Sequence, residues 1–75
     1  MIELVEYLVS SLVPDGDYTV EQRDANNAND IVITIAKKDI GKIIGKNGKT
    51  IAAIRLLVSG AGGRMGLRLT VDVLD

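Results

Sequence analysis

The stretch that decides the fold reads Ile43-Ile44-Gly45-Lys46-Asn47-Gly48-Lys49-Thr50-Ile51. Two glycines lie three residues apart, with an isoleucine on each side of the pair. Glycine has no β-carbon, so the backbone is free to turn sharply here and another chain is able to approach its N–H groups closely. Ile44 and Ile51 are expected to anchor one helix each in the core and to hold the loop rigid. The pattern predicts a tight loop between two helices that suits a sugar–phosphate backbone.

The glycine pair by itself is weak evidence, because glycine is common in any plain turn between two helices. Three lysines strengthen the phosphate interpretation: Lys46 and Lys49 lie in or beside the loop, and Lys42 lies shortly before it. The amide groups at the start of the second helix add partial positive charge that favours an anion. Asn47 has two interpretations, either as a cap on that helix or as a phosphate contact.

The segments that follow the central strand change from helical to strand-like patterns. A short helix begins at Lys38 or Asp39, and a longer helix is expected over residues 49–59, ended by the glycine-rich residues 60–63. Residues 67–74 alternate between apolar and polar, which predicts a strand with one buried face. The apolar members of that strand are Leu67, Leu69, Val71 and Val73.

The first half of the chain predicts one helix and two strands. Apolar residues recur at helical spacing over residues 2–13, and Pro14 ends that helix. Residues 17–24 alternate weakly and predict an edge strand. Residues 26–29 are rich in asparagine and predict a turn. Residues 31–36 are β-branched and apolar on nearly every position, which predicts a central strand covered by helices.

The predicted order of elements is α-β-β-α-α-β, which indicates an α+β fold with two layers. Three helices would cover one face of a three-stranded mixed sheet. The first two strands are expected to form an antiparallel hairpin. The third returns through a helical crossover and is therefore expected to run parallel to the second.

The charge of the chain is divided unevenly between its halves. The 75 residues carry a formal charge of −1. Residues 1–36 hold one basic and seven acidic side chains, whereas residues 37–75 hold eight basic and three acidic ones. The division either arose by chance in a small chain or marks the second half, which contains the glycine loop, as a surface for an anionic partner.

Composition excludes several classes of protein. The chain contains no cysteine and no histidine, so disulfides and the usual metal-ligand sets are absent and no metal or cofactor is expected. The start of the chain lacks the pattern of a signal peptide, and no apolar run approaches the roughly 20 residues that span a bilayer. We therefore expect a cytoplasmic protein that neither enters a membrane nor takes a small-molecule substrate.

These residues together resemble a type II KH domain, and in particular the KhpA family of short bacterial stand-alone KH proteins. The resemblance rests on the element order, on the run Asp39–Gly48, on its continuation Ala52–Arg55, and on the closing strand Thr70–Val73. It implies a single KH domain over residues 1–75. The N-terminal helix and first strand would occupy 1–28, and the core βααβ motif 29–75.

The resemblance implies that single-stranded RNA lies in a narrow groove beside the GxxG loop, with about four nucleotides held by their backbone. It also implies a homodimer, or a heterodimer with a larger Jag-type KH protein (KhpB). The role would be that of an RNA chaperone or post-transcriptional regulator linked to bacterial growth and division. The candidate RNA-binding residues are Ile40, Lys42, Ile44, Gly45, Lys46, Asn47, Gly48, Lys49 and Arg55.

Aromatic side chains are scarce, since Tyr7 and Tyr18 are the only two. A platform on which bases stack against aromatic rings is therefore absent. Bases would instead lie on an aliphatic floor near the loop, for which Ile40, Ile43 and Ile44 are the candidates. At least one of these three is expected to belong purely to the core.

The longer helix presents two faces in the sequence pattern. Ile51, Ile54, Val58 and Ala61 form the expected core stripe. A second face is small and partly apolar, and it is either a partner interface or a mildly apolar surface in solvent. Its members are Ala52, Leu56, Ser59 and Gly63.

Functions of other classes fit less well. Acidic residues gather near the turns, but no base, nucleophile or metal set accompanies them, so we expect no catalysis. A helix-turn-helix reader of DNA needs a polar second helix, and Thr50–Val58 is mostly apolar. Single-stranded DNA remains an alternative to RNA, because the loop would grip the backbone. The other open alternative is a dimerisation module whose partner supplies most of the RNA contacts.

Overall fold

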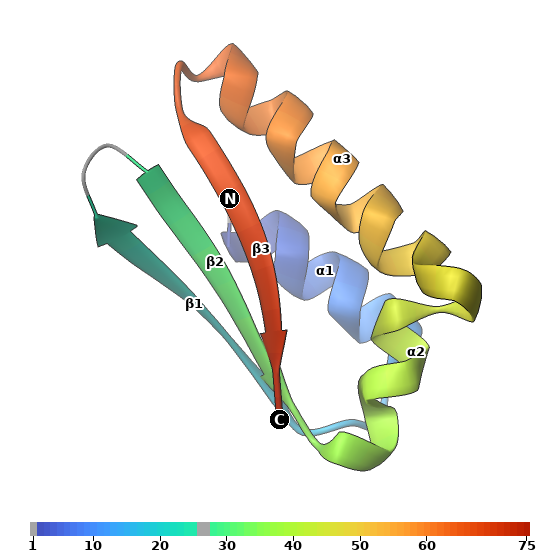
Figure 1. Ribbon diagram of the computed structural model, residues 1–75. Helices are drawn as coiled ribbons and strands as arrows, with labels where there is room; N and C mark the ends of the chain where they lie inside the picture. Colours follow the sequence, from blue (N-terminus) through green and yellow to red (C-terminus); the bar gives the residue numbers. More distant parts are fainter. Residues whose placement is uncertain (1, 26–27) are drawn as a thin grey trace.

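Helices cover one face of a three-stranded sheet in the computed structural model, which describes residues 2–25 and 28–75 (Figure 1). The α+β class, the two layers and the order α-β-β-α-α-β are confirmed. Short 3-10 turns at Lys37–Asp39 and Lys46–Gly48 precede the second and third helices. The elements are α1 (Ile2–Leu12), β1 (Tyr18–Ala25), β2 (Ala28–Ile35), α2 (Ile40–Ile44), α3 (Lys49–Arg64) and β3 (Arg68–Leu74).

The sheet has the predicted mixed topology, with strand order β1-β2-β3. β1 and β2 pair antiparallel, and β2 and β3 pair parallel, with Ile31 opposite Val71. The central position of β2 explains its composition, because Ile31, Val32, Ile33 and Ile35 are all buried. β1 and β3 are both edge strands.

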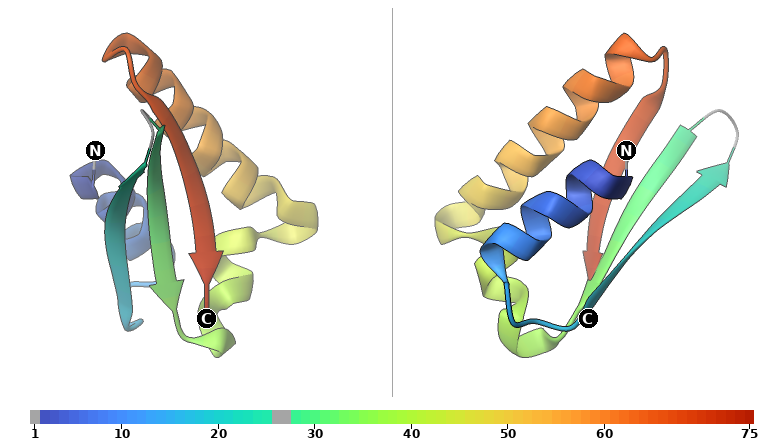
Figure 2. Two further views of the ribbon diagram at one scale, coloured as in Figure 1. Left: turned by 60° about the vertical axis from the view of Figure 1, so that its left-hand side comes forward. Right: turned by 180° about the vertical axis from the view of Figure 1, so that it is seen from behind.

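The core lies between the sheet and the helices behind it (Figure 2). Each helix contributes apolar residues at helical spacing, and each strand contributes alternate residues. The largest fully buried side chains of this core are Ile31, Ile33, Ile43, Val5, Val9, Val13 and Val58. In β3, Leu69 and Val71 are buried while Arg68, Thr70 and Asp72 are exposed, so the predicted alternation is confirmed.

The β1–β2 hairpin is longer than the sequence indicated. Ala28 pairs with Ala25 and Asn29 pairs with Asp24, so the prediction of a turn over 26–29 is wrong for its last two residues. Strand pairing across the sheet extends β2 over positions whose local composition favours a turn. The remainder of that turn, residues 26–27, lies outside the described residues.

The end of α3 is the main correction to the predicted elements. The helix was expected to end at Ser59, but it continues through three glycines to Arg64. Its true end is a Schellman motif, in which Leu67 N–H donates to the Gly62 carbonyl at 2.8 Å and Gly66 N–H donates to Gly63 at 3.2 Å. Gly66 takes the left-handed conformation (φ 72°) that this cap requires.

Close contact between α3 and β3 explains why a glycine lies inside the helix. Gly62 is buried, and a β-carbon there would lie 2.7 Å from Leu69 Cδ1 and 3.2 Å from the Leu67 carbonyl oxygen. Gly62 therefore completes the buried stripe of Ile51, Ile54 and Val58. The prediction that Ala61 occupies this place is wrong, because Ala61 is only half-buried.

Two kinds of feature are absent from the part of the chain that the structure describes. No helix in residues 2–25 or 28–75 has the length and apolar character needed to cross a bilayer. Within the same ranges, no three acidic side chains gather closely enough to bind a metal ion.

Candidate nucleic-acid interface

Gly45 ends α2 in a conformation that only glycine adopts readily. Its φ of 77° and ψ of 174° lie in a region closed to side chains by steric clashes. A β-carbon at this position would overlap the side chain of Thr50 and lie 2.9 Å from the Thr50 backbone nitrogen. The first glycine of the motif is therefore fixed both by its dihedral angles and by the close approach of α3.

The two residues before α3 both take the left-handed conformation. Asn47 has φ 57° and ψ 27°, and Gly48 has φ 74° and ψ 13°. Asparagine is among the few non-glycine residues that visit this region routinely. Gly48 N–H donates to the Gly45 carbonyl at 3.2 Å and closes the turn. The side chain of Asn47 is exposed and does not cap α3, so that interpretation is wrong, and the phosphate contact stays a prediction.

The lysines of the motif differ in their surroundings. Lys46 and Lys49 are exposed, and neither forms an ion pair within the described ranges. Lys42 instead places its Nζ 3.4 Å from Oδ1 of the buried Asp39. It lines a hollow with the α1–β1 connection around Gly16. Lys46 and Lys49 are thus free to meet an anion. Lys42 pairs with Asp39 but keeps a side chain that is 62% exposed, so its contact with RNA stays a prediction.

The isoleucines of α2 divide between core and surface. Ile43 is fully buried, which confirms that at least one of the three aliphatic candidates belongs purely to the core. Ile40 and Ile44 are half-buried and pack against the core cluster from its edge. These two side chains keep some exposed apolar surface next to the loop.

Arg55 lies at the edge of β3, two turns of α3 after the loop. Its Nε–H donates to the Val71 carbonyl oxygen at 3.2 Å. A hollow of about 300 Å³ separates α3 from β3 at this point. The residues that line it are Arg55, Ser59, Leu69, Thr70, Val71 and Asp72. Sequence reasoning missed the β3 members, because nothing in the sequence gives the register of α3 against β3.

Two carboxylates lie close together beside this hollow. A hydrogen bond with Asp30 raises the pKa of the Asp72 carboxyl, and repulsion from the Asp30 charge adds to the effect. The guanidinium of Arg55 acts in the opposite direction. Thr70 Oγ1 donates to Asp30 Oδ1 at 2.9 Å, which ties the pair to the outer face of the sheet. This edge therefore combines one guanidinium with a concentration of negative charge.

The second face of α3 is exposed as the sequence predicted. Ala52, Leu56, Ser59 and Gly63 are all exposed, and the Leu56 side chain reaches 78% exposure. A shallow depression runs along this face between Ala52 and Gly60. Its assignment as a partner interface stays a prediction.

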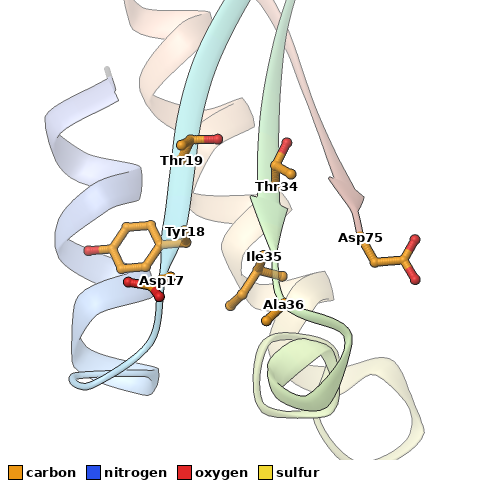
Figure 3. A pocket seen from close by; sticks show the side chains of 7 residues that line it. All are labelled: Asp17, Tyr18, Thr19, Thr34, Ile35, Ala36 and Asp75. Atoms are coloured by element: carbon orange, nitrogen blue, oxygen red, sulfur yellow. The ribbon is translucent and has the colours of Figure 1, made fainter.

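Another hollow, of about 580 Å³, lies at the end of the sheet where β1 begins and β2 and β3 end (Figure 3). The ring of Tyr18 turns toward α1 there, where its hydroxyl lies 3.5 Å from the Glu6 carbonyl oxygen. The charged residues in its lining, Asp17 and Asp75, are both acidic. Phosphate would be repelled from this hollow, so size alone does not make it the nucleic-acid site.

Several known proteins are similar in sequence to this chain over its whole length. The proteins named RNA-binding protein KhpA from Chlamydia trachomatis serovar D and Mycobacterium tuberculosis H37Rv are 38% and 39% identical to this chain. Both matches cover 100% of this chain, and they cover 97% and 91% of those proteins. The protein of that name from Halalkalibacterium halodurans is 35% identical, with full coverage of both chains.

A solved structure and a family model extend the comparison. The crystal structure of APE1850 matches 95% of this chain with a TM-score of 0.68 and 28% identity. This chain spans only 49% of that one, so the likeness concerns part of a longer protein. The family model described as the KH domain of KhpA and KhpB matches residues 2–73. The chain therefore belongs to the KhpA/KhpB family of KH-domain proteins.

Proposed function

We propose that this protein binds short single-stranded RNA without catalysing a reaction, by holding the sugar–phosphate backbone against residues 45–49. The observation that carries the proposal is the conformation of Gly45, which leaves no space for a β-carbon. Asn47 and Gly48 also have positive φ, and the side chains of Lys46 and Lys49 on either side of them are exposed. The name of the relatives, RNA-binding protein KhpA, supports RNA as the ligand.

The chemistry of this grip follows from the residues around the loop. Phosphate oxygens would accept hydrogen bonds from loop N–H groups and pair with Lys46 and Lys49. The bases would rest on the exposed parts of Ile40 and Ile44, since aromatic stacking partners are absent. Few phosphates are contacted, so the affinity should fall only gently as salt rises.

In the cell we propose a cytoplasmic RNA chaperone or regulator linked to growth and division, acting as a homodimer or with a KhpB-type partner. A second candidate function is a dimerisation module whose partner supplies most RNA contacts. The exposure of Leu56 and Leu57, at 78% and 54%, favours this candidate. The two functions differ in whether the isolated protein binds RNA through its own loop.

A titration of labelled single-stranded RNA tests the proposal. The parent is compared with Lys46→Asp/Asn47→Asp at low and moderate salt, because aspartate tolerates the left-handed conformation and preserves the loop. The matched control is Thr19→Asp/Arg23→Asp, which makes the same change in formal charge on the opposite edge strand β1. We expect the loop variant to lose at least tenfold in affinity and the control to lose far less.

Two other outcomes of the titration would contradict RNA binding through the loop. Equal binding by the parent and the loop variant would move the site to other basic residues. Absence of binding by the parent would favour the dimerisation module.

A further inference from the structure

Arg55 has hydrogen-bond donors that the proposed binding of the RNA backbone by the loop does not use. Its Nε–H is bound to the Val71 carbonyl, but its other N–H groups make no hydrogen bond or ion pair with the residues described in the structure. An arginine side chain carries five N–H donors in a rigid planar fork. The bond to β3 therefore fixes the guanidinium in place while its two terminal nitrogens stay available.

The hollow beside Arg55 has the features of a small ligand site. It measures about 300 Å³, and its lining joins the aliphatic side chain of Leu69 to polar groups of Ser59, Thr70 and Asp72. Sites for small organic ligands typically combine apolar surface with a few polar groups at fixed positions. β3 is an edge strand, so its outward backbone groups have no neighbouring strand to pair with.

The charges around the hollow favour a base over a phosphate. Asp72 lines it, and Asp30 lies against Asp72 on the neighbouring strand. A phosphate that approached Arg55 would also approach these two carboxylates and be repelled. A nucleobase is neutral, so it can accept hydrogen bonds from the guanidinium without that repulsion.

The donors of Arg55 favour guanine over adenine and cytosine. Two parallel N–H groups of arginine match the adjacent O6 and N7 acceptors of guanine, whereas adenine offers a donor next to its acceptor on the same edge. Cytosine also has two adjacent acceptors, O2 and N3, when it is unpaired. Guanine, however, adds a pair of donors, N1–H and the amino group, on its adjoining edge. These donors suit the nearby Asp72 carboxylate better than the single amino group of cytosine.

We infer that Arg55 and the edge of β3 form a pocket for one unpaired guanine, whose O6 and N7 accept from the two terminal nitrogens of Arg55. The inference rests on the proposed function, because the loop has to hold the strand first. Arg55 follows Gly48 by seven residues, which is about 10 Å along a helix. Figure 1 shows α3 leading from the loop toward the start of β3. At this distance from the loop, the pocket lies within reach of the four nucleotides of a KH groove.

The test uses labelled heptauridine that carries guanine, adenine, cytosine or 7-deazaguanine at its centre. We expect the parent to bind the guanine oligonucleotide about five- to tenfold more tightly than the adenine one, near the lower end for a bidentate arginine–guanine pair. 7-Deazaguanine lacks N7 and should lose most of that preference. Because this probe changes no protein atom, its result is independent of folding.

A pair of conservative variants assigns the preference to Arg55. Arg55→Lys keeps the positive charge but not the fork, and should bind the guanine and adenine oligonucleotides with equal affinity. Arg64→Lys makes the same change at the end of α3 and should keep the preference for guanine.

Each outcome decides between the two proposals. Loop-dependent RNA binding without a guanine preference, or with a preference that survives in Arg55→Lys, overturns the guanine pocket and leaves the proposed function standing. A preference for cytosine also overturns it. Absence of RNA binding by the parent overturns both.

Discussion

Gly45 and Gly48 both have positive φ, but the structure constrains them differently. Gly45 combines an extended ψ of 174° with the close approach of Thr50, so neither its angles nor its surroundings admit a side chain. Gly48 lies in the left-handed helical region, and a β-carbon there would meet nothing within 4 Å. The spacing of the motif identifies both glycines, but only the structure shows that Gly45 requires glycine more strictly than Gly48 does.

This ranking predicts unequal effects of the same substitution. Gly45→Ala should lower the free energy of unfolding by about 2–4 kcal/mol, because strain and steric overlap add together. Gly48→Ala should cost only about 1 kcal/mol, since strain alone acts there. Gly48→Asn should cost still less, because asparagine tolerates this region, as Asn47 already shows.

Urea unfolding of the three variants, followed by circular dichroism, measures these differences. Equal losses at the two glycines would show that Thr50 does not constrain the loop. A loss of RNA affinity in Gly48→Asn at full stability would indicate that the backbone needs the absence of a side chain at this position.

At the scale of the elements, the sequence predicts what depends on local pattern and misses what depends on contact between elements. The helical period of Ile51, Ile54 and Val58 and the alternation of β3 are visible locally, and both are confirmed. The true end of α3 is not visible locally, because three glycines among residues 60–63 suggest that the helix ends there. The helix nevertheless continues to Arg64, because Gly62 packs against Leu69 and the cap at Gly66 lies beyond these glycines.

The same limit applies to the candidate site. The loop and its lysines follow from spacing, but the hydrogen bond from Arg55 to Val71 joins residues 16 positions apart through the packing of α3 on β3. No periodicity encodes that register. The engagement of Lys42 by Asp39 was missed for a different reason, since it depends on the burial of an acidic side chain that composition would place at the surface.

The glycines of α3 offer a matched pair of substitutions with opposite expected signs. Gly60 is exposed within the helix and a β-carbon there meets nothing, so Gly60→Ala should raise the free energy of unfolding by about 0.5–1 kcal/mol. Gly62→Ala should lower it by about 1–3 kcal/mol, because the added methyl group would force α3 away from Leu69.

Thermal and urea unfolding at low protein concentration test this pair without interference from association. A gain in stability for Gly62→Ala would show that α3 and β3 are not in close contact at this point. A loss for Gly60→Ala would show that its position is not helical in solution.

At the scale of the whole molecule, the uneven charge of the sequence becomes a division between structural elements. The acidic half forms α1 and the β1–β2 hairpin, whereas the basic half forms α2, the loop, α3 and β3 (Figure 2). Asp30 and Asp72 extend the negative charge across the open face of the sheet. RNA is therefore expected to stay on the loop side, and the net charge of −1 does not oppose binding there.

The outer face of α3 is suited to association with a second copy of the chain. α3 has 16 residues and is about 24 Å long, enough to pack along a second copy of itself. Small residues such as Ala52, Ser59 and Gly63 would let the two helices approach closely, and Leu56 would supply the apolar contact. Leu56→Glu places two like charges in that contact, so it should convert a dimer to monomers.

Sedimentation velocity at a concentration where the parent is dimeric measures the effect. The matched control is Tyr7→Glu, which places the same charge on a 69% exposed apolar side chain of α1 and should leave the mass unchanged. If Leu56→Glu also leaves the mass unchanged, or if the parent is monomeric throughout, the face is not a self-association surface. Loss of the dimer should also weaken binding to RNA long enough to span two loops, because the second contact is then no longer intramolecular. Affinity for a four-nucleotide RNA should not change, since one loop alone holds it.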